Sequence, residues 1–216
     1  MTYKSKDRFY KQAKNDRYAA RSVYKLEELD RRYGLFKKGQ QIIDLGCAPG
    51  SWMQYVAGKI GKKGLLLGYD IVPSQIGVPL PSAWRVANVH ELTATDILAA
   101  LYELRHGEPP PDSSHPPPMR IDALISDMAP KLTGIRDADQ AKSVELQSVA
   151  LALADALVKP GGFFVAKLFQ GRDTDEFVRR VKSSYKEAKL LKPEATREGS
   201  REVFLLARSK RTPVDS

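Results

Sequence analysis

The chain alternates short apolar runs with stretches of helical periodicity, and this alternation restricts the folds it can adopt. Near-continuous apolar runs of about four to eight residues are typical of strands that are buried on both faces, as in a mainly parallel sheet covered by helices. The sequence therefore predicts an α/β fold with helices on both faces of one sheet. The strong strand candidates are QQIIDLG (40–46), GLLLGYD (64–70), RIDALISD (120–127), GGFFVAKLF (161–169) and REVFLLAR (201–208), and weaker candidates lie at 84–89 and 187–193. Helices are expected near 21–33, 51–61, 94–106, 137–158 and 173–184.

Composition excludes several classes of protein. With 216 residues, of which 42% are hydrophobic, the chain can bury a core of its own. The single cysteine, Cys47, excludes an internal disulfide framework, and three scattered histidines predict no metal site. No apolar run approaches the ~18 residues of a membrane span, and the N-terminus lacks an apolar signal core. We therefore expect a soluble cytoplasmic protein that binds no membrane.

Three segments depart from the alternation and set the expected domain boundaries. Residues 1–20 are expected to form a basic N-terminal arm, and residues 21–210 one folded domain. Within that domain, residues 106–118 hold six of the fourteen prolines, so they are expected to form an inserted surface loop. Residues 211–216 are expected to be a disordered tail.

The basic charge is concentrated at the start of the chain. The net charge is +9, and residues 1–40 contain twelve Lys or Arg against five Asp or Glu, which is a net charge of +7. Aromatic residues are interleaved with this charge, a pattern that can follow a phosphate backbone and stack on bases. A solvated basic tail, or an arm whose aromatics pack on the domain, is the alternative.

The most informative motif is the turn DLGCAPGSW, from Asp44 to Trp52, which follows a strand candidate and opens a helix. Gly46 and Gly50 allow the backbone to turn tightly and to approach a ligand closely. The spacing matches neither GxGxxG nor the GK[ST] phosphate loop, which argues against NAD and ATP. A D/E-x-G-x-x-x-G turn is instead the usual mark of S-adenosylmethionine binding. Asp70, at the end of the next strand candidate, is placed to bind both ribose hydroxyls of a cofactor, or to cap a turn.

Four charged residues form a second candidate group. Asp127 ends one strand candidate, Lys167 lies within the next, Glu202 begins the last, and Lys25 lies in the 21–33 helix. Taken singly, Asp127 is explained by loop capping and Lys167 by a side chain that reaches the sheet edge. Taken together, two lysines and two carboxylates can neutralise one another in one cleft, where an unpaired charge would be costly.

In the order of these motifs, the sequence resembles the FtsJ/RrmJ-like ribosomal RNA 2′-O-ribose methyltransferases over about residues 15–210. The resemblance rests on RSVYKLEELDRRYGL, IIDLGCAPGSWMQYV, ISDMAPKLTG, VAKLFQG and SREVFLLA. It implies a Rossmann-like S-adenosylmethionine-dependent methyltransferase fold, in which six strands of a seven-stranded sheet are parallel and the last is antiparallel. It also implies that 21–210 is the methyltransferase domain and that Lys25, Asp127, Lys167 and Glu202 are its catalytic residues.

The resemblance further implies a cofactor site for S-adenosylmethionine. Its expected residues are Asp44, Gly46, Cys47, Ala48, Pro49, Gly50, Trp52, Asp70, Asn88 and Asp127. Two positions depart from the family pattern. The alanine pair of the glycine turn is here Cys47–Ala48, which we expect to be a packing substitution. Asn88 stands where bacterial members commonly carry an acidic residue, and it is expected at the amino edge of the adenine.

The implied reaction is methylation of the ribose 2′-hydroxyl of a uridine in 23S ribosomal RNA, within the large ribosomal particle, by a monomeric enzyme. Lys167 is expected to accept the hydroxyl proton or to orient the hydroxyl, and Asp127 to hold the Lys167 amine. Lys25 and Glu202 are expected to pair and to position the ribose. The expected RNA contacts of the basic arm are Lys4, Lys6, Arg8, Lys11, Lys14, Arg17 and Arg21.

Three other functions are compatible with parts of this pattern. The same four charged residues would serve a methyltransferase that acts on transfer RNA or another structured RNA. A binding protein that keeps the fold without catalysis would not need them, and they argue against it. A small-molecule methyltransferase would not need the basic N-terminus.

Overall fold

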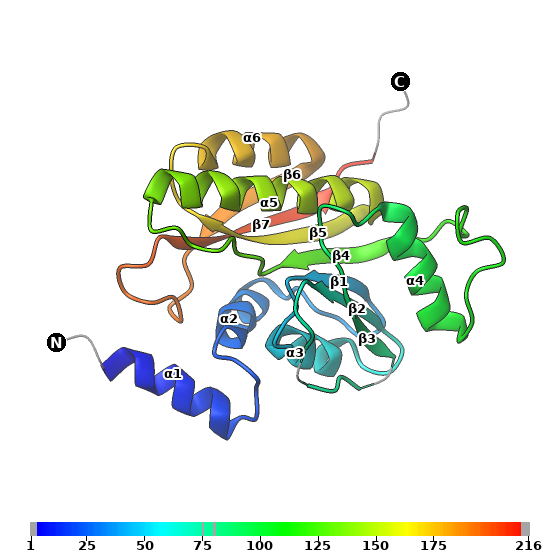
Figure 1. Cartoon of the computed structure of the whole chain (residues 1–216), viewed down its shortest axis with the longest axis horizontal. Helices are drawn as coiled ribbons and strands as arrows, with labels where there is room; N and C mark the ends of the chain where they lie inside the picture. The colour runs from blue at the N-terminus through cyan, green and yellow to red at the C-terminus, as the bar shows by residue number, and fades with distance from the viewer. Residues whose placement is uncertain (1–3, 75, 80, 213–216) are drawn as a thin grey trace.

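A computed structural model describes residues 4–74, 76–79 and 81–212 of the chain, with side chains from Arg8 onward. Within these residues, one sheet has the strand order β3-β2-β1-β4-β5-β7-β6, and helices flank it (Figure 1). The strands are β1 (Gln41–Leu45), β2 (Leu65–Asp70), β3 (Ser82–Val86), β4 (Ile121–Ser126), β5 (Val158–Phe169), β6 (Tyr185–Leu191) and β7 (Glu202–Lys210). The helices are α1 (Lys4–Asn15), α2 (Val23–Tyr33), α3 (Ser51–Ile60), α4 (Ala94–His106), α5 (Arg136–Leu157) and α6 (Thr174–Ser184).

Strand direction confirms the predicted fold class. The β1–β2, β1–β4, β2–β3 and β4–β5 pairs are parallel, whereas β7 is antiparallel to both of its neighbours, β5 and β6. Six strands therefore run one way and β7 runs the other. The carboxyl ends of β1, β2, β4 and β5 meet at one edge of the sheet, where ligands bind in folds of this kind.

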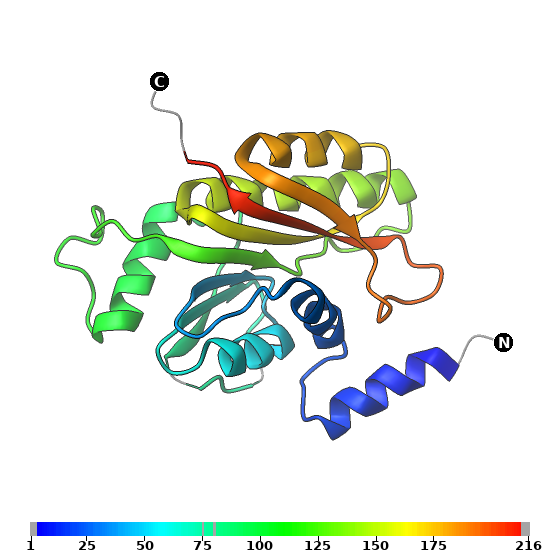
Figure 2. The same ribbon diagram turned by 180° about the vertical axis from the view of Figure 1, so that it is seen from behind.

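Two apolar cores lie on opposite faces of the sheet and explain the continuous apolar runs. Ile43 and Leu45 of β1 face the core that is covered by α4, α5 and α6. Ile42, the residue before Ile43, faces the core that is covered by α2 and α3. Figures 1 and 2 show these two helical layers from opposite sides. Because successive side chains of a strand point to opposite faces, a strand covered on both faces needs apolar residues at every position.

The weaker strand predictions were shifted in position. β3 ends at Val86, so that 87–89 form the loop after the strand and were wrongly included in it. β6 occupies Tyr185–Leu191 instead of 187–193. Both strands lie at an edge of the sheet, where one side of the strand has no neighbouring strand. More of their residues are exposed, so the continuous apolar pattern that marks a central strand is weaker.

The proline-rich segment and the residue after α2 both interrupt regular structure. Residues 107–120 contain no helix or strand, so the proline-rich insertion is an irregular loop that follows α4. Gly34 ends α2 in the left-handed region, with φ of 61°. Ser22 precedes α2 without a capping hydrogen bond from its side chain, and its hydroxyl lies 3.0 Å from that of Ser51 instead.

The basic N-terminal segment forms a helix that is docked on the domain. In α1, Ala13 is buried and the ring of Phe9 lies 5.7 Å from that of Tyr24 in α2. The Tyr24 hydroxyl donates a hydrogen bond to Asp16. Phe9 and Tyr18 therefore pack on the domain, whereas Tyr10 is 64% exposed. The side chains of Lys4 and Lys6 and residues 213–216 of the expected tail lie outside the described residues.

None of the helices in the described ranges is long and apolar enough to cross a bilayer.

In α2, the buried carboxylate of Asp30 joins this helix to its surroundings. It accepts hydrogen bonds from the Phe36 amide at 2.9 Å and the Tyr55 hydroxyl at 2.8 Å, and it forms an ion pair with Lys59 at 3.0 Å. Since Tyr55 and Lys59 belong to α3, Asp30 sets the position of α2 against α3, and with it the position of Lys25.

We predict that Asp30→Asn lowers the free energy of unfolding by about 2 kcal/mol at neutral pH, because hydrogen bonds to a charged group contribute about 1.5–3 kcal/mol. Burial opposes ionisation of Asp30, but the donors from Phe36, Tyr55 and Lys59 outweigh it and lower its pKa. A lowered pKa adds stability above the unfolded-state pKa, and this stability is lost as pH falls through the folded-state pKa. Urea unfolding across this pH range, with the exposed Glu145→Gln as control, should show a deficit that disappears in acid. A deficit unchanged by pH would contradict the role of the charge.

Candidate functional site

The glycine turn joins the ends of β1 and β2. Gly46, with φ of 79°, donates its N–H to the Tyr69 carbonyl at 2.8 Å. A Cβ added at Gly46 would lie 2.8 Å from the Met128 backbone nitrogen, so that a larger residue would push away the chain that follows β4. Gly50 begins α3 with φ of 110°. The turn therefore requires glycine at both positions.

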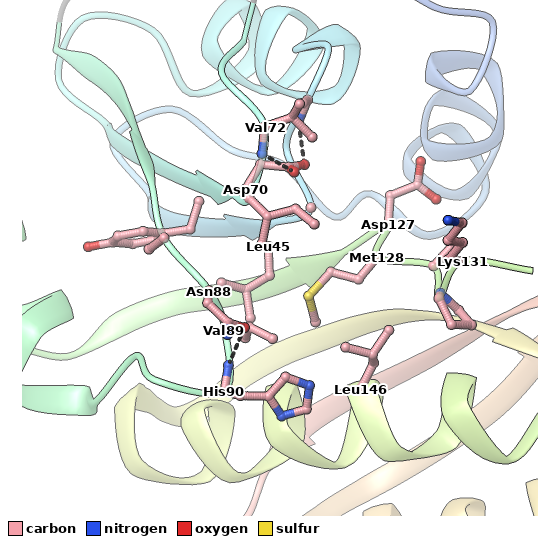
Figure 3. A pocket seen from close by; sticks show the side chains of 17 residues that line it. Leu45, Asp70, Val72, Asn88, Val89, His90, Asp127, Met128, Lys131 and Leu146 are labelled. Atoms are coloured by element: carbon pink, nitrogen blue, oxygen red, sulfur yellow. Dashed lines mark hydrogen bonds between the residues drawn. The ribbon is translucent and has the colours of Figure 1, made fainter.

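A hollow of about 450 Å³ opens beside this turn at the carboxyl edge of the sheet (Figure 3). Its volume is in the range of about 300–1,000 Å³ that is usual for small-molecule sites. Five parts of the chain contribute to its wall: residues 45, 46 and 48 at the end of β1, 69–72 at the end of β2, 87–90 after β3, 127–131 after β4, and Leu146 of α5. Apolar side chains, among them Val72, Val89 and Leu146, cover much of this wall and suit a flat heterocycle. We call this space the cofactor hollow.

Half of the expected cofactor residues line this hollow. They are Gly46, Ala48, Asp70, Asn88 and Asp127. The Asp70 carboxylate accepts hydrogen bonds from the Ala48 amide at 2.9 Å and the Val72 amide at 3.0 Å. Asp70 thus holds the glycine turn to the end of β2, which is the structural role considered for it, while its remaining lone pairs face the hollow. Asn88 donates to Glu91 and accepts from the His90 amide, which orients its side chain.

The other five expected cofactor residues, Asp44, Cys47, Pro49, Gly50 and Trp52, do not line the hollow. Cys47 is buried, and its Sγ would lie 2.8 Å from a Cβ added at Gly68, which fits the expected packing substitution. Trp52 is also buried. Its Nε1 donates to the Ser22 carbonyl at 3.0 Å, and its ring lies 5.8 Å from that of Phe204. The structure therefore places Trp52 under α2 and β7.

Asp44 is unusual among these residues because its carboxylate is buried without a hydrogen-bond partner within the described residues. Burial raises the pKa of Asp44 well above its ordinary value, and the nearby Asp127 and Asp70 raise it further. Burial also raises the pKa of Asp127, although Lys167 opposes this effect. Asp70 and Asp127 thus line one end of the cofactor hollow, and the carboxylate of Asp44 lies behind its wall.

This excess of negative charge favours a ligand that carries positive charge. No group of three or more His, Cys, Asp or Glu side chains in the described ranges is arranged to hold a metal ion. A small molecule with a sulfonium and an ammonium group would contact Asp70 and Asp127 in the wall of the hollow, with the buried, unpartnered carboxylate of Asp44 behind that wall. The residues present therefore fit S-adenosylmethionine.

The four predicted catalytic residues meet in a second hollow of about 400 Å³, which we call the acceptor hollow. The Lys167 Nζ lies 2.8 Å from Asp127 Oδ1 and also donates to the Asp127 carbonyl. Lys25 forms an ion pair and a hydrogen bond with Glu202. All four side chains are 11–17% exposed. The structure thus brings together residues from α2, β5, β7 and the end of β4 as two nearly buried ion pairs.

The acceptor hollow also holds two arginines. Arg21, an expected RNA contact, donates to the Ala195 carbonyl at 2.8 Å. Arg197 lies on the β6–β7 loop and was missed by sequence reasoning, because an irregular loop has no periodicity that marks one cation among several. Burial lowers the pKa of Arg21, and the like charge of Arg197 lowers it further. Two guanidinium groups that repel each other beside one hollow favour an anionic ligand between them.

The remaining expected RNA contacts are spread along α1 and its C-terminal loop. Arg8 lies against the Phe9 ring and lines a separate hollow that Glu27, Glu28 and Glu194 also line. The expected contacts at 11, 14 and 17 are exposed. Among the described expected contacts, Arg21 is the one that lines the acceptor hollow.

The fold and the two adjoining hollows are those of a Rossmann-like methyltransferase. Comparison with known proteins agrees: the chain belongs to the FtsJ-like methyltransferase family, which it matches over residues 18–210. It is 41% identical to the ribosomal RNA large subunit methyltransferase E of Bdellovibrio bacteriovorus, over 98% of this chain and all of the relative. It is 39% identical to the protein of the same name from Myxococcus xanthus, over 98% of this chain and 92% of the relative.

Solved structures agree with this assignment. A ribosomal RNA methyltransferase from Plasmodium falciparum superposes with a TM-score of 0.71 and 25% identity, over 89% of this chain and 98% of that chain. Human methyltransferase-like protein 13, solved in complex with SAH, shares the fold with a TM-score of 0.52 and 17% identity, over 78% of this chain and 71% of that chain.

We predict that Asp44→Asn raises the melting temperature of the ligand-free protein at neutral pH and weakens S-adenosylmethionine binding. The raised pKa of Asp44 means that stability falls as pH rises from the unfolded-state pKa to the folded-state pKa, and asparagine removes this cost. The affinity should fall about tenfold, because the attraction between a buried carboxylate behind the wall and a cationic ligand acts through a medium of low dielectric constant. Thermal unfolding over a pH series and calorimetric titration would measure both effects.

The exposed Glu108→Gln serves as the control for this pair of measurements, because it removes a carboxylate on the proline-rich loop. A lower melting temperature for Asp44→Asn, or unchanged cofactor affinity, would contradict this role. Asp44 would then not be an unpaired carboxylate that destabilises the ligand-free protein and favours a cationic ligand.

Proposed function

We propose that this protein transfers a methyl group from S-adenosylmethionine to the ribose 2′-hydroxyl of a uridine in large-subunit 23S ribosomal RNA, within the ribosomal particle. The observation that carries the proposal is that Asp127 and Ala129 line both the cofactor hollow and the acceptor hollow. A donor and an acceptor held in the two hollows would therefore meet at Asp127. The names of the relatives, which specify large-subunit ribosomal RNA, support this choice of substrate.

In this proposal the cofactor hollow binds S-adenosylmethionine, which supplies a methyl group already activated by the positive sulfur. The backbone at Gly46 and Ala48 borders the ligand, and Asp70 accepts hydrogen bonds from its ribose hydroxyls. Asn88 contacts the adenine edge, and Asp44 balances the positive charge. These residues hold and orient the donor, and orientation alone can contribute up to about 7–11 kcal/mol to catalysis.

The acceptor hollow is proposed to position the RNA ribose. Lys25 and Glu202 offer a donor and an acceptor to its hydroxyls, and Lys167 is aimed by Asp127. As the 2′-oxygen bonds to the methyl carbon and the carbon–sulfur bond breaks, the hydroxyl proton leaves the oxygen. It passes to the Lys167 Nζ when that amine is neutral, and to solvent when Lys167 only orients the hydroxyl. Both hollows are built from one chain, which supports a monomer, and we propose that this monomer acts in the cytoplasm.

We predict that Lys167→Ala lowers kcat by about 10²–10⁴-fold, the usual contribution of a positioned acid–base group, while S-adenosylmethionine still binds. Lys167→Arg separates the two roles, because arginine stays protonated and can orient the hydroxyl but cannot accept its proton. Single-turnover methyl transfer and cofactor titration are the measurements. Lys63→Ala, on the α3–β2 turn at the opposite edge of the sheet, is the matched control. Near-normal turnover of Lys167→Ala would refute the assignment.

The substrate itself is tested by transfer of labelled methyl groups to large ribosomal particles from a strain that lacks the enzyme, followed by mapping of the modified ribose. Transfer RNA is the competing substrate in the same assay. Label on a base, or on transfer RNA alone, would overturn the proposed substrate.

We also predict that the basic N-terminus contributes to RNA binding. Deleting residues 1–14 would remove Phe9 and Ala13 and expose the apolar surface on which they pack, so a charge reversal at the exposed Lys14 is the cleaner change. Lys14→Glu should weaken binding to ribosomal particles and make its salt dependence shallower, because fewer counterions are released. Lys63→Glu is the control, and cofactor affinity should not change. An unchanged salt slope would remove Lys14 from the RNA interface.

A further inference from the structure

A third hollow, of about 280 Å³, continues the acceptor hollow on the side away from the cofactor. Leu132, Phe169 and Ser200 line both spaces, whereas the cofactor hollow shares none of these residues. The three hollows therefore follow one another along the carboxyl edge of the sheet, with the two ion pairs in the middle. An RNA strand whose ribose occupies the acceptor hollow can continue into the third hollow.

One wall of the third hollow holds a preorganised guanidinium group. Arg201 donates its Nε and Nη2 to the Gln170 carbonyl at 3.0 and 2.6 Å. Gly171 leaves space for this arrangement, because a Cβ there would lie 3.0 Å from Arg201 Nη2. Two of the five N–H donors of Arg201 are thereby used, and the other three are available to a ligand.

A second arginine, Arg136, lines the same hollow from the first position of α5 and is exposed. The carboxylate in this hollow, Asp139, is already engaged: it accepts hydrogen bonds from the Thr133 amide and hydroxyl and from the Gly134 amide. The hollow thus presents two cations and one carboxylate that is turned toward its own loop. Such a charge distribution favours a phosphate group.

The floor of the hollow is aromatic. Phe169 is half-buried at the end of β5, directly across from Glu202 of β7, so that it lies at the boundary between the two spaces. Leu132, on the β4–α5 loop, is 63% exposed and adds apolar surface. An aromatic ring beside cations is the usual combination for stacking a base while holding its phosphate.

We propose that the third hollow binds the nucleotide next to the methylated one, with its phosphate between Arg136 and Arg201 and its base against Phe169. This inference rests on the proposed RNA methylation, since it extends the path of the same strand. Arg136 is a positioning residue here: it holds the substrate and does not touch the reacting atoms.

The test is steady-state methyl transfer to large ribosomal particles by Arg136→Ala, Arg136→Lys and the control Arg179→Ala, which removes an exposed arginine on α6. Arg136→Ala should raise KM for the particles about tenfold and leave kcat unchanged. The dependence of log(kcat/KM) on log salt should become shallower by about 0.7–0.9, which corresponds to one phosphate contact. Arg136→Lys should restore the salt slope but only part of the KM, because lysine cannot make a bidentate contact.

A second substitution tests the stacking surface. Phe169→Leu should raise KM about fivefold or more, and Phe169→Tyr should retain the parent value, since a tyrosine ring also stacks. Cofactor affinity, measured separately, should be unchanged in every variant.

The outcomes separate this inference from the proposed function. If the parent protein methylates the particles and Arg136→Ala matches Arg179→Ala in both KM and salt slope, the neighbouring-nucleotide site is wrong and the proposed function stands. If the parent protein fails to methylate ribose in the particles, both fail. A fall in kcat without a change in KM would also contradict the inference, because it would place Arg136 in the chemistry instead of in substrate binding.

Discussion

The contact between Lys167 and Asp127 organises the carboxyl edge of this sheet. Asp127 follows β4, and Lys167 lies near the end of the neighbouring parallel strand β5, so the strand pairing itself brings the ammonium to within 2.8 Å of Asp127 Oδ1. Both side chains are nearly buried, and each would be costly there without the other. Because Asp127 lines both the cofactor hollow and the acceptor hollow, this one pair determines where the two spaces meet.

The reversed direction of β7 completes the arrangement. β7 is antiparallel to β5, so its first residue, Glu202, lies beside Phe169 at the end of β5. A parallel β7 would have placed its first residue at the opposite edge of the sheet. On the other side, Asp30 fixes α2 against α3, and Trp52 packs beneath Phe204, whose ring lies 5.7 Å from the Lys25 Nζ. The Lys25–Glu202 pair therefore depends on helix packing as well as on the sheet.

Sequence reasoning succeeded where a residue's position follows from its strand. Asp127 and Lys167 were predicted from their positions in apolar runs, and strand pairing made them neighbours. It was less successful where a residue's role depends on the direction of its side chain. Trp52 and Asp44 belong to the predicted glycine turn, but one packs under β7 and the other lies behind the wall of the cofactor hollow. Arg197 had no sequence signal because it lies in an irregular loop, and Arg136 had none because it is one exposed charge at the start of α5.

The sequence by itself determined the α/β class, the positions of the central strands, the glycine turn and the four charged residues. These features are local, since apolar periodicity and glycine spacing act over a few neighbouring residues. Only the tertiary structure decided that basic residues 1–20 contain a helix docked through Phe9 and Ala13, that three hollows adjoin along one edge, and that Arg136 and Arg201 share the last of them. These features depend on contacts between residues far apart in the chain, which strand order and helix packing bring together.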